Sequence, residues 1–330
     1  MIRTAIIGLG AISIAHISAI SKCRQVELVA VCDVNSEKRS VLPHIPFYED
    51  FEEMFAEEEL DAVHICLPHH LHTMVSRKAA ENKIHIFVEK PIGIGFQDFE
   101  SMLFLEETYG VCVGVCLQNR YNKTSQRIKK IIESKEYGDL KGIKAILAWN
   151  RGMDYYFKDP WRGAVSGAGS GLLLSQAIHT IDLLAFLAGE VEWVKGATGN
   201  LLLEEIEVED TAMAYIKHLN GVGSVFFGTV IHCINSNVEM EFVFENNVVY
   251  MNDDQLFLIN EGERKILAKN HKISEGKKYY GAGHTLAIKQ FYSSINNDKQ
   301  DYISVQDAYE CIKIIDGILK SDKKNEKIFL

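Results

Sequence analysis

The chain has no basic stretch that could offset its acidic residues. Its formal net charge is -10 at pH 7, with 35 lysines and arginines against 45 aspartates and glutamates. Nucleic-acid binding depends on lysine and arginine that neutralise phosphates, so this balance argues against a nucleic-acid partner. Hydrophobic residues make up 47% of the chain and charged residues 24%, which is typical of a soluble globular protein.

Features of secreted and membrane proteins are also missing. The seven cysteines are an odd number and dispersed, and no Cys-x-x-Cys pair occurs, so the sequence suggests neither a disulfide framework nor a zinc site. The N-terminus enters a strand directly, without a basic and apolar leader. No uninterrupted apolar run is long enough to span a bilayer. We therefore expect a cytoplasmic protein with no membrane partner.

A glycine-rich turn follows the first expected strand, Ile2–Ile7. The turn, Gly8-Leu9-Gly10-Ala11-Ile12-Ser13, leads into a helix through about Ser21, and a second strand, Val26–Cys32, ends at Asp33. In this arrangement glycines let the turn approach a pyrophosphate, the helix N-terminus supplies amides, and the acid binds ribose hydroxyls. Because a carboxylate repels a 2′-phosphate, the sequence favours NAD over NADP.

Strands and helices continue to alternate after Asp33. The expected strands are Asp61–Leu67, Ile84–Val88 and Val111–Leu117, and the expected helices are Leu71–Asn82 and Phe96–Tyr109. This alternation predicts a doubly wound parallel sheet with ligands at the carboxyl ends of its strands. Three polar segments follow those ends: Pro68-His69-His70-Leu71-His72, Glu89-Lys90-Pro91 and Gln118-Asn119-Arg120. Three histidines in one short loop seldom converge on a metal, so we predict a cofactor-side wall or plain surface there and no metal site.

Lys90 is the residue whose position most favours catalysis. Pro91 restricts Lys90 to extended backbone conformations, and a fixed ammonium group in a cofactor cleft can polarise a substrate oxygen or exchange a proton with it. The simpler alternative is a lysine at a strand end that pairs with Glu89.

The second half of the chain begins with a helix at Thr124–Lys135 and a strand at Gly142–Asn150. An apolar, buried helix is expected over Leu172–Leu187, with Ser175, Gln176, His179 and Asp182 as its polar exceptions. Residues three or four apart share a helix face, and buried polar groups must be hydrogen-bonded. Either His179 is a core histidine bonded to Asp182, or it faces the cleft as a proton acceptor.

After this helix the period changes to that of short strands. Asp210–His218 and Val222–Ile231 flank Asn220-Gly221, a strong hairpin signal. We predict an α/β fold in two domains. Residues 1–120 form a dinucleotide-binding domain with the doubly wound parallel sheet. Residues 121–330 form a second α/β domain with a large open, mainly antiparallel sheet, of which one face is covered by another subunit.

These residues resemble the Gfo/Idh/MocA oxidoreductases, the family of glucose–fructose oxidoreductase and inositol dehydrogenase. The resemblance covers nearly the whole chain, and several ordered motifs are far more specific than any one of them. The motifs are Gly8-Leu9-Gly10 with His16, Pro68 with His72, Glu89-Lys90-Pro91, Asn119-Arg120, Pro160-Trp161-Arg162-Gly163, Gln176-Ala177-Ile178-His179-Thr180-Ile181-Asp182 and Gly281-Ala282-Gly283-His284.

The resemblance implies an N-terminal Rossmann domain and a C-terminal sheet that forms homodimers or homotetramers. It also implies hydride transfer between NAD and a secondary alcohol or ketone of a sugar, cyclitol or sugar derivative. Lys90 would contact the reacting oxygen, and His179 would be the acid/base. Many members carry an aspartate four residues before this histidine, where Ser175 stands here. A hydroxyl cannot supply a carboxylate's charge, so we expect altered specificity rather than inactivity.

Sequence pattern and resemblance together give two sets of predicted site residues. The predicted cofactor-binding residues are Gly8, Gly10, Ala11, Ile12, Asp33, Leu67, Pro68, His72, Glu89, Lys90 and Asn119. The predicted substrate-binding residues are Lys90, Asn119, Tyr156, Trp161, Arg162, Ser175, Gln176, His179 and His284. Gln176 is expected to orient His179, and Arg162 could receive a phosphate or carboxylate or form a structural ion pair.

The leading functional hypothesis is an NAD-dependent dehydrogenase in which Lys90 and His179 handle the oxygen and the proton. A second hypothesis is a glycoside hydrolase that uses NAD for transient oxidation. A third is an NAD-binding sensor without catalysis, which the presence of Ser175 favours and the retention of both Lys90 and His179 disfavours.

Overall fold

The computed structural model describes residues 1–252, 254–260, 263–270, 283–297 and 299–330. These residues form two compact units. The first comprises residues 1–118 and 283–308, and the second comprises the described residues from 119 to 270 together with 309–330.

The first unit is built on a six-stranded sheet. Its strands are β1 (Ile2–Ile7), β2 (Val26–Cys32), β3 (Phe47–Tyr48), β4 (Ala62–Ile65), β5 (His85–Val88) and β6 (Val113–Val115). The strand order is β3-β2-β1-β4-β5-β6, and every neighbouring pair is parallel. This order confirms the predicted doubly wound sheet, whose ligand crevice lies at the carboxyl ends of the strands.

Helices connect these strands. They are α1 (Ser13–Ile20), the 3-10 helix η1 (Ser36–Val41), α2 (Phe51–Glu57), α3 (His69–Glu81), α4 (Phe96–Met102), α5 (Leu105–Tyr109) and α10 (Gly283–Asn297). Two differ from the sequence prediction. The expected helix Phe96–Tyr109 is divided into α4 and α5, and α3 begins at His69, so the histidine-rich segment is a first helical turn rather than a loop.

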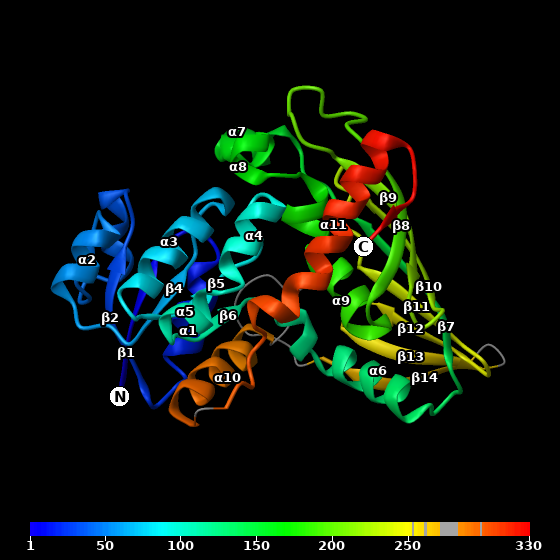
Figure 1. Cartoon of the computed structure of the whole chain (residues 1–330), viewed down its shortest axis with the longest axis horizontal. Coiled ribbons are helices and arrows are strands. Elements are labelled where there is room, and N and C mark those ends of the chain that lie inside the picture. The colour runs from blue at the N-terminus through cyan, green and yellow to red at the C-terminus, as the bar shows by residue number, and fades with distance from the viewer. Residues whose placement is uncertain (253, 261–262, 271–282, 298) are drawn as a thin grey trace. The chain divides into compact units, whose positions relative to one another are not determined.

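The chain returns to the first unit near its C-terminus. Helix α10 packs against α1 (Figure 1), and the amide of Val115 in β6 donates to the carbonyl of Ile303 at 2.8 Å. Residues 283–308 therefore belong to the core of the first unit, although they follow the second unit's sheet in sequence.

The second unit contains a nine-stranded sheet. Its strands are β7 (Leu140–Ala148), β8 (Val191–Gly199), β9 (Thr211–His218), β10 (Gly223–Thr229), β11 (Glu239–Phe244), β12 (Val248–Asn252), β13 (Gln255–Asn260), β14 (Glu263–Lys269) and β15 (Ile328–Phe329). The strand order is β14-β13-β12-β11-β7-β10-β9-β8-β15. Only β7 and β10 pair in parallel, which confirms the predicted, mainly antiparallel sheet. The hairpin signal at Asn220-Gly221 corresponds to the turn between β9 and β10.

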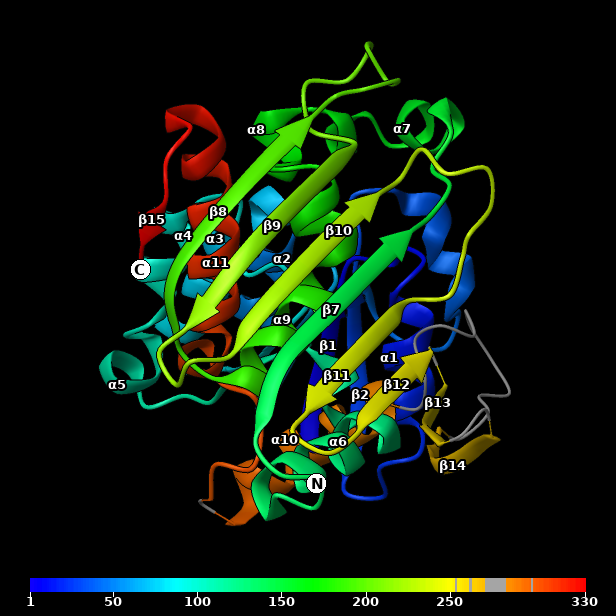
Figure 2. The ribbon, with the colours of Figure 1, turned by 90° about the vertical axis from the view of Figure 1, so that its right-hand side faces the viewer.

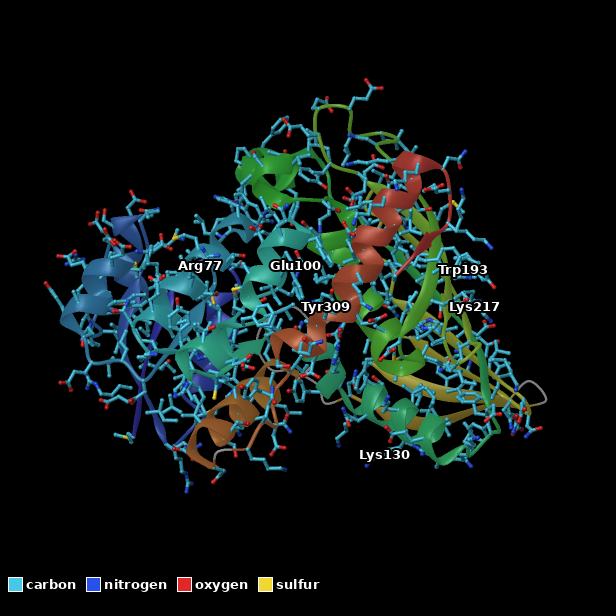
Figure 3. The ribbon with its side chains drawn as sticks, viewed as in Figure 1. Arg77, Glu100, Lys130, Trp193, Lys217 and Tyr309 are labelled. Carbon is cyan, nitrogen blue, oxygen red and sulfur yellow. The ribbon has the colours of Figure 1, made fainter. Side chains whose placement is uncertain are left out.

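Helices of the second unit lie on one face of this sheet, and the other face is open (Figure 2). The helices are α6 (Lys123–Ser134), α7 (Met153–Lys158), η3 (Pro160–Gly163), α8 (Val165–Ala168), the π-helix η4 (Leu172–Ala177), α9 (Ile178–Ala188) and α11 (Val305–Lys324), of which the first residues belong to the first unit. Side chains alternate along β9 and β10 as a half-covered sheet requires: the interior ones are buried, and Met213, Tyr215, Val225 and Phe227 are exposed. Trp193 and Lys217 lie on the side of the sheet away from Tyr309 of α11 (Figure 3).

One segment of the described chain, Val165–Ala188, is apolar and long enough by composition to cross a membrane. It is not an uninterrupted apolar run, because serines, His179 and Asp182 interrupt the segment. In the structure 83% of its most apolar stretch is buried, so it packs as the central helical segment of the second unit.

Candidate functional site

The glycine turn after β1 has the geometry that the sequence predicts. Gly8 has φ +93°, and a Cβ at this position would lie 2.4 Å from the carbonyl oxygen of Cys66. A Cβ on Gly10 would meet no atom within 4 Å, so the backbone there borders open space. The hydroxyl of Ser13 donates to the carbonyl of Gly10 at 2.7 Å, which ties the turn to the start of α1. The turn fits a bound phosphate backbone.

Asp33 faces this turn from the end of β2. Its Oδ2 accepts from the amide of Leu9 at 2.7 Å and from Nζ of Lys38 at 2.9 Å, and its Oδ1 accepts from the amide of Asn35 at 3.0 Å. Burial alone would raise the pKa of Asp33, but the hydrogen bonds from these amides and from Lys38 outweigh it, so the pKa is lowered. An ionised carboxylate with one lone-pair site left on Oδ1 suits a ribose hydroxyl.

Substitutions at the two glycines should separate folding from cofactor binding. Gly10→Ala is expected to weaken NAD binding by about 10- to 100-fold, because the added methyl group occupies the space that a pyrophosphate needs. Its thermal unfolding midpoint should stay near that of the wild type. Gly8→Ala should instead lower that midpoint, because of the positive φ and the contact with Cys66. Calorimetric titration with NAD and thermal melts measure both effects. Unchanged NAD affinity in Gly10→Ala would show that the open space is not the cofactor's.

The histidine-rich segment separates into residues with different environments. His70 is exposed and His69 is buried. His72 is fully buried, and its ring nitrogens contact the carbonyl of Pro91 at 2.6 Å and that of Leu67 at 2.7 Å. Burial lowers the pKa of His72, against the two carbonyls, which favour the charged ring. The side chain therefore joins the end of β4 to the segment that carries Lys90.

Glu89 and Lys90 follow β5. Lys90 is half-buried, whereas Glu89 is buried and contacts two histidines. Its Oε1 lies 2.9 Å from Nε2 of His16 and 3.7 Å from Nε2 of His284. Burial would raise the pKa of Glu89, but the hydrogen bonds and charges of His16 and His284 hold it well below its usual range. His284, predicted to bind substrate, thus lies in the first unit beside a carboxylate.

Hydrogen-bond directions reveal the charge state of His16. The Thr4 hydroxyl donates to the carbonyl of Ala62 at 3.1 Å, and the Tyr292 hydroxyl donates to Thr4 at 2.9 Å. Tyr292 must therefore accept from Nε2 of His64, which lies 2.6 Å away. Burial holds the pKa of His64 well below its usual value, so this ring is neutral and its Nδ1 is an acceptor.

His16 is the next residue in this series of hydrogen bonds. Its Nδ1 lies 2.8 Å from Nδ1 of His64 and must donate, because that atom of His64 has no proton. Its Nε2 faces the ionised carboxylate of Glu89 and must also donate. A proton on each ring nitrogen makes the imidazole a cation, so the hydrogen bonds favour a buried His16–Glu89 ion pair immediately before Lys90.

His16, Glu89 and Cys116 are the group in the described part of the chain whose ligand atoms could surround a metal, since these atoms lie within 4.8 Å of one another. The hydrogen bonds argue for another arrangement. Both nitrogens of His16 are already hydrogen-bonded, and burial raises the pKa of the Cys116 thiol well above its usual value, which disfavours metal binding. The group is a hydrogen-bonded cluster.

In the second unit, Ser175 and Gln176 lie in a π-helical turn and His179 follows in the first turn of α9. All three side chains are half-buried. The regular helix predicted over Leu172–Leu187 is thus wrong up to Ala177. π-Helical turns are rare and are frequent at functional sites. Gln176 accepts from Nε of Arg151 at 3.2 Å and donates to the Tyr155 hydroxyl at 3.0 Å, so its amide is engaged with the aromatic segment.

Asp182 has a partner that sequence reasoning did not identify. Arg120 donates to both of its carboxylate oxygens, at 2.6 Å from Nη2 to Oδ1 and 2.9 Å from Nε to Oδ2. Asp182 is fully buried, and the Arg120 side chain is 11% exposed. This ion pair joins the first turn of the second unit, η2 (Gln118–Tyr121), to α9. The side-chain Oδ1 of Asn119, on the same turn, is buried without a hydrogen-bond partner in the described structure, which suits a residue that binds a ligand.

The segment between β7 and η4 that is rich in aromatic residues, Tyr155 to Gly163, lies in the short helices α7 and η3. Tyr156 is buried, whereas Tyr155 and Trp161 are half-buried. Arg162 pairs with Asp159 at 2.9 Å, and its guanidinium lies 4.2 Å from the ring centroid of Tyr155. Of the two roles considered for Arg162, the structure thus contains the ion pair.

Sequence reasoning missed three polar residues of these clusters. His64 and Tyr292 belong to the series of hydrogen bonds that ends at His16, and Arg151 contacts Gln176. A histidine inside the apolar strand Ala62–Ile65 was a signal for the first cluster. Arg151 follows a strand end, as Asp33 and Lys90 do.

Comparison with known proteins gives matches over most of the chain. Residues 2–117 match a model described as "Oxidoreductase family, NAD-binding Rossmann fold", and residues 125–249 match the "GFO/IDH/MocA C-terminal domain". The myo-inositol 2-dehydrogenase of Thermotoga maritima is 21% identical over 326 residues, which cover 93% of this chain and 92% of that protein. The levoglucosan dehydrogenase of Pseudarthrobacter phenanthrenivorans is 25% identical over 83% of this chain and 81% of its own length.

A solved structure is similar throughout. The WlbA dehydrogenase of Bordetella pertussis, in complex with NADH and UDP-GlcNAcA, has a TM-score of 0.86 and is 26% identical, covering 100% of this chain and 98% of that one. These matches confirm the resemblance that the motifs indicated, together with the predicted fold and the NAD-binding domain.

Proposed function

Because the chain belongs to the Gfo/Idh/MocA family of NAD-binding oxidoreductases, we propose that it is a dehydrogenase of a secondary alcohol or ketone on a sugar, cyclitol or sugar derivative. The family match carries this proposal. The substrate class is supported by the relatives named as myo-inositol and levoglucosan dehydrogenases. The predicted dinucleotide-binding domain, residues 1–120, binds NAD, and the second unit binds the substrate.

The turn residues Gly8, Gly10, Ala11 and Ile12 hold the pyrophosphate, and Asp33 holds the adenosine ribose. Leu67, Pro68, His72, Glu89 and Asn119 complete the predicted cofactor wall. Two observations support this assignment: the space beside Gly10 and the orphaned oxygen of Asn119. Bound NAD supplies an acceptor for the hydride of the carbinol carbon.

Lys90 contacts the oxygen of that carbon and stabilises the charge that develops on it. Three features of the first unit support this role. Glu89 contacts His16 and His284, which fix the residue before Lys90. His72 binds the carbonyl of Pro91 and so holds the segment in place. Lys90 itself is only half-buried.

His179 takes the hydroxyl proton during oxidation and returns it during reduction. Its half-buried position after a π-helical turn is suited to a group that meets a ligand. Asp182, which the sequence offered as the partner of a core histidine, binds Arg120 through both carboxylate oxygens. Ser175 provides a hydroxyl where many relatives provide a carboxylate, so the acid/base works without that negative charge. Trp161 and Arg162 line the substrate side of the second unit together with Tyr156.

A substrate screen tests the proposal. The purified chain with NAD is mixed with cyclitols, aldoses, sugar phosphates and nucleotide sugars, and NADH formation and thermal shifts are recorded. A sugar that both stabilises the protein and yields NADH is the expected result. Proton exchange at a sugar carbon without net NADH would indicate the glycoside hydrolase. NAD binding with neither product nor exchange across the panel would indicate the sensor.

The open face of the nine-stranded sheet is the interface of a homodimer or homotetramer. Its exposed apolar residues Met213, Tyr215, Val225 and Phe227 support this assignment, because monomers rarely expose contiguous apolar patches. Light scattering should give a mass of two or four chains, and a monomer at micromolar concentration would contradict it. All seven cysteines are free, which supports a cytoplasmic location.

A further inference from the structure

We propose that Arg151 binds an anionic group of the substrate, so that the preferred substrate is a sugar derivative carrying a carboxylate or phosphate. The inference rests on the proposed function in treating the bound ligand as a substrate. The evidence for the anion-binding group itself comes from the second unit alone. Arg151 was not among the residues that the sequence motifs singled out.

The backbone of Arg151 is fixed. It follows β7, and its amide donates to the carbonyl of Val230 at 2.7 Å, so the β7–β10 pairing continues past the strand ends. The guanidinium is held along one edge. Nε donates to Gln176 at 3.2 Å, and Nη1 donates to the carbonyl of Asn150 and to Oδ1 of Asn235, both at 2.7 Å. A long side chain with this many bonds loses little further freedom when it binds a ligand.

The other edge of the guanidinium is open. Nη2 donates to no residue of the described chain, and it is not among the buried polar atoms that lack a partner, so its two N–H groups reach solvent. The plane lies against aromatic rings, with the guanidinium carbon 5.0 Å from the Trp149 ring centroid and 5.7 Å from that of Tyr155. Those rings shield one part of the cation while the Nη2 edge stays available.

Within the described residues, the charge of Arg151 has no counter-ion. All three of its acceptors are neutral, and within the described ranges no carboxylate oxygen lies within 4.0 Å of it. Its neighbours differ in this respect, because Arg162 pairs with Asp159 and Arg120 pairs with Asp182. The guanidinium groups of Arg151 and Arg162 therefore both contact the Tyr155 ring, but only that of Arg162 is paired with a carboxylate. A half-buried cation without a partner is costly unless a ligand supplies the anion.

Gln176 links this cation to the proposed chemistry. Its carbonyl accepts from Arg151, and it lies three residues before His179 on the same helical segment. An anionic group bound at Nη2 would position the rest of the substrate relative to that helix. Charge-assisted pairing to a guanidinium suits carboxylates and phosphates equally, so the chemistry defines an anionic sugar without choosing between them.

Matched neutral and anionic ligands test the inference. Glucose, glucuronate and glucose 6-phosphate, N-acetylglucosamine and its uronate, and UDP-sugars with and without a uronate group are compared by thermal shift with NAD present. At least one anionic member should stabilise the wild type more than its neutral counterpart, and which arm responds identifies carboxylate or phosphate. Arg151→Met should remove this difference, a loss of about 10- to 100-fold in affinity. Arg127→Met, on an exposed helix of the same unit, should not.

Kinetics on any turned-over pair give the second measurement. Arg151→Met should raise KM for the anionic substrate and leave kcat/KM for the neutral one near the wild-type value. Equal losses on both members, restored by no variant including Arg151→Lys, would show a purely structural role. Stabilisation by neutral and anionic members alike would also overturn the proposal. Arg151-dependent binding without any NADH would instead retain the anion site and reject the dehydrogenase.

Discussion

Replacing Lys90 with methionine should lower kcat by about 10²–10⁴-fold, the range that positioned proton-transfer and charge-stabilising groups contribute. Methionine keeps much of the length and apolar volume of the side chain and removes the ammonium group, so the change tests charge rather than packing. NAD affinity should remain close to that of the wild type, because the turn at Gly8 and Gly10 and the carboxylate of Asp33 carry cofactor binding.

The matched control is Lys78→Met. Lys78 lies on α3 of the same unit, is exposed, and pairs with Glu52 at 3.2 Å. This variant should retain both activity and NAD affinity, since exposed ion pairs contribute little. Initial rates at saturating NAD and substrate, with separate titrations of NAD, distinguish the two effects. A Lys90→Met variant that turns over normally at saturation but has lost NAD binding would assign Lys90 to the cofactor alone.

The first unit shows how far sequence can predict position. Ile2–Ile7 and Val26–Cys32 were predicted to the residue, because each is mostly apolar and β-branched and is followed by a glycine or an acid. The strands β3 and β8 were not predicted. β3 contains two residues, and β8 includes Glu192, Lys195 and two glycines, so its pattern is not that of a strand with an apolar interior face.

Long-range polar contacts were beyond sequence reasoning. His179 and Asp182 are three apart, and the sequence therefore offered each as the other's partner. Asp182 pairs with Arg120, 62 residues away, a contact that no local spacing indicates. Helix start sites and i,i+3 spacings are local, whereas the pairing of Arg120 with Asp182 depends on how the chain folds back between them. Glu89 likewise pairs with His16, 73 residues earlier.

The π-helical turn could not be predicted from the sequence for a different reason. Leu172–Leu187 is apolar on most faces, and apolar composition gives no sign of whether the hydrogen bonds run to the fourth or the fifth residue. Gly171 lies at its start, where a Cβ would be 2.2 Å from the carbonyl of Glu209. The close approach of Gly171 to the segment that precedes β9 fixes where the helix begins. That constraint comes from tertiary structure.

The buried pair of His16 and Glu89 should produce the largest change in stability. Glu89→Ala removes the anion and leaves a fully buried imidazolium uncompensated, which is expected to destabilise the first unit by about 3–5 kcal/mol. Glu89→Gln should cost much less. Its amide can donate to Nε2 of a neutral His16, while Nδ1–H of His16 still donates to His64, so every polar atom keeps a partner. Urea unfolding, with hydrogen exchange of β1 and α1 amides as the local probe, measures both variants.

Acid stability gives this pair a second signature. The pKa of Glu89 is held well below the ordinary value of 4.5, so its folded-state charge stabilises the protein above that value, and the stabilisation is lost as the pH falls through the lower folded-state pKa. The wild type should therefore lose its advantage over Glu89→Gln as the pH is lowered below about 4.5. A constant difference between the two across this window, or equal destabilisation by alanine and glutamine, would mean that His16 is neutral and Glu89 protonated in the folded chain. In that case the hydrogen bonds from Thr4 through Tyr292 and His64 would keep their directions. One proton alone would move, from Nε2 of His16 to the carboxyl group of Glu89.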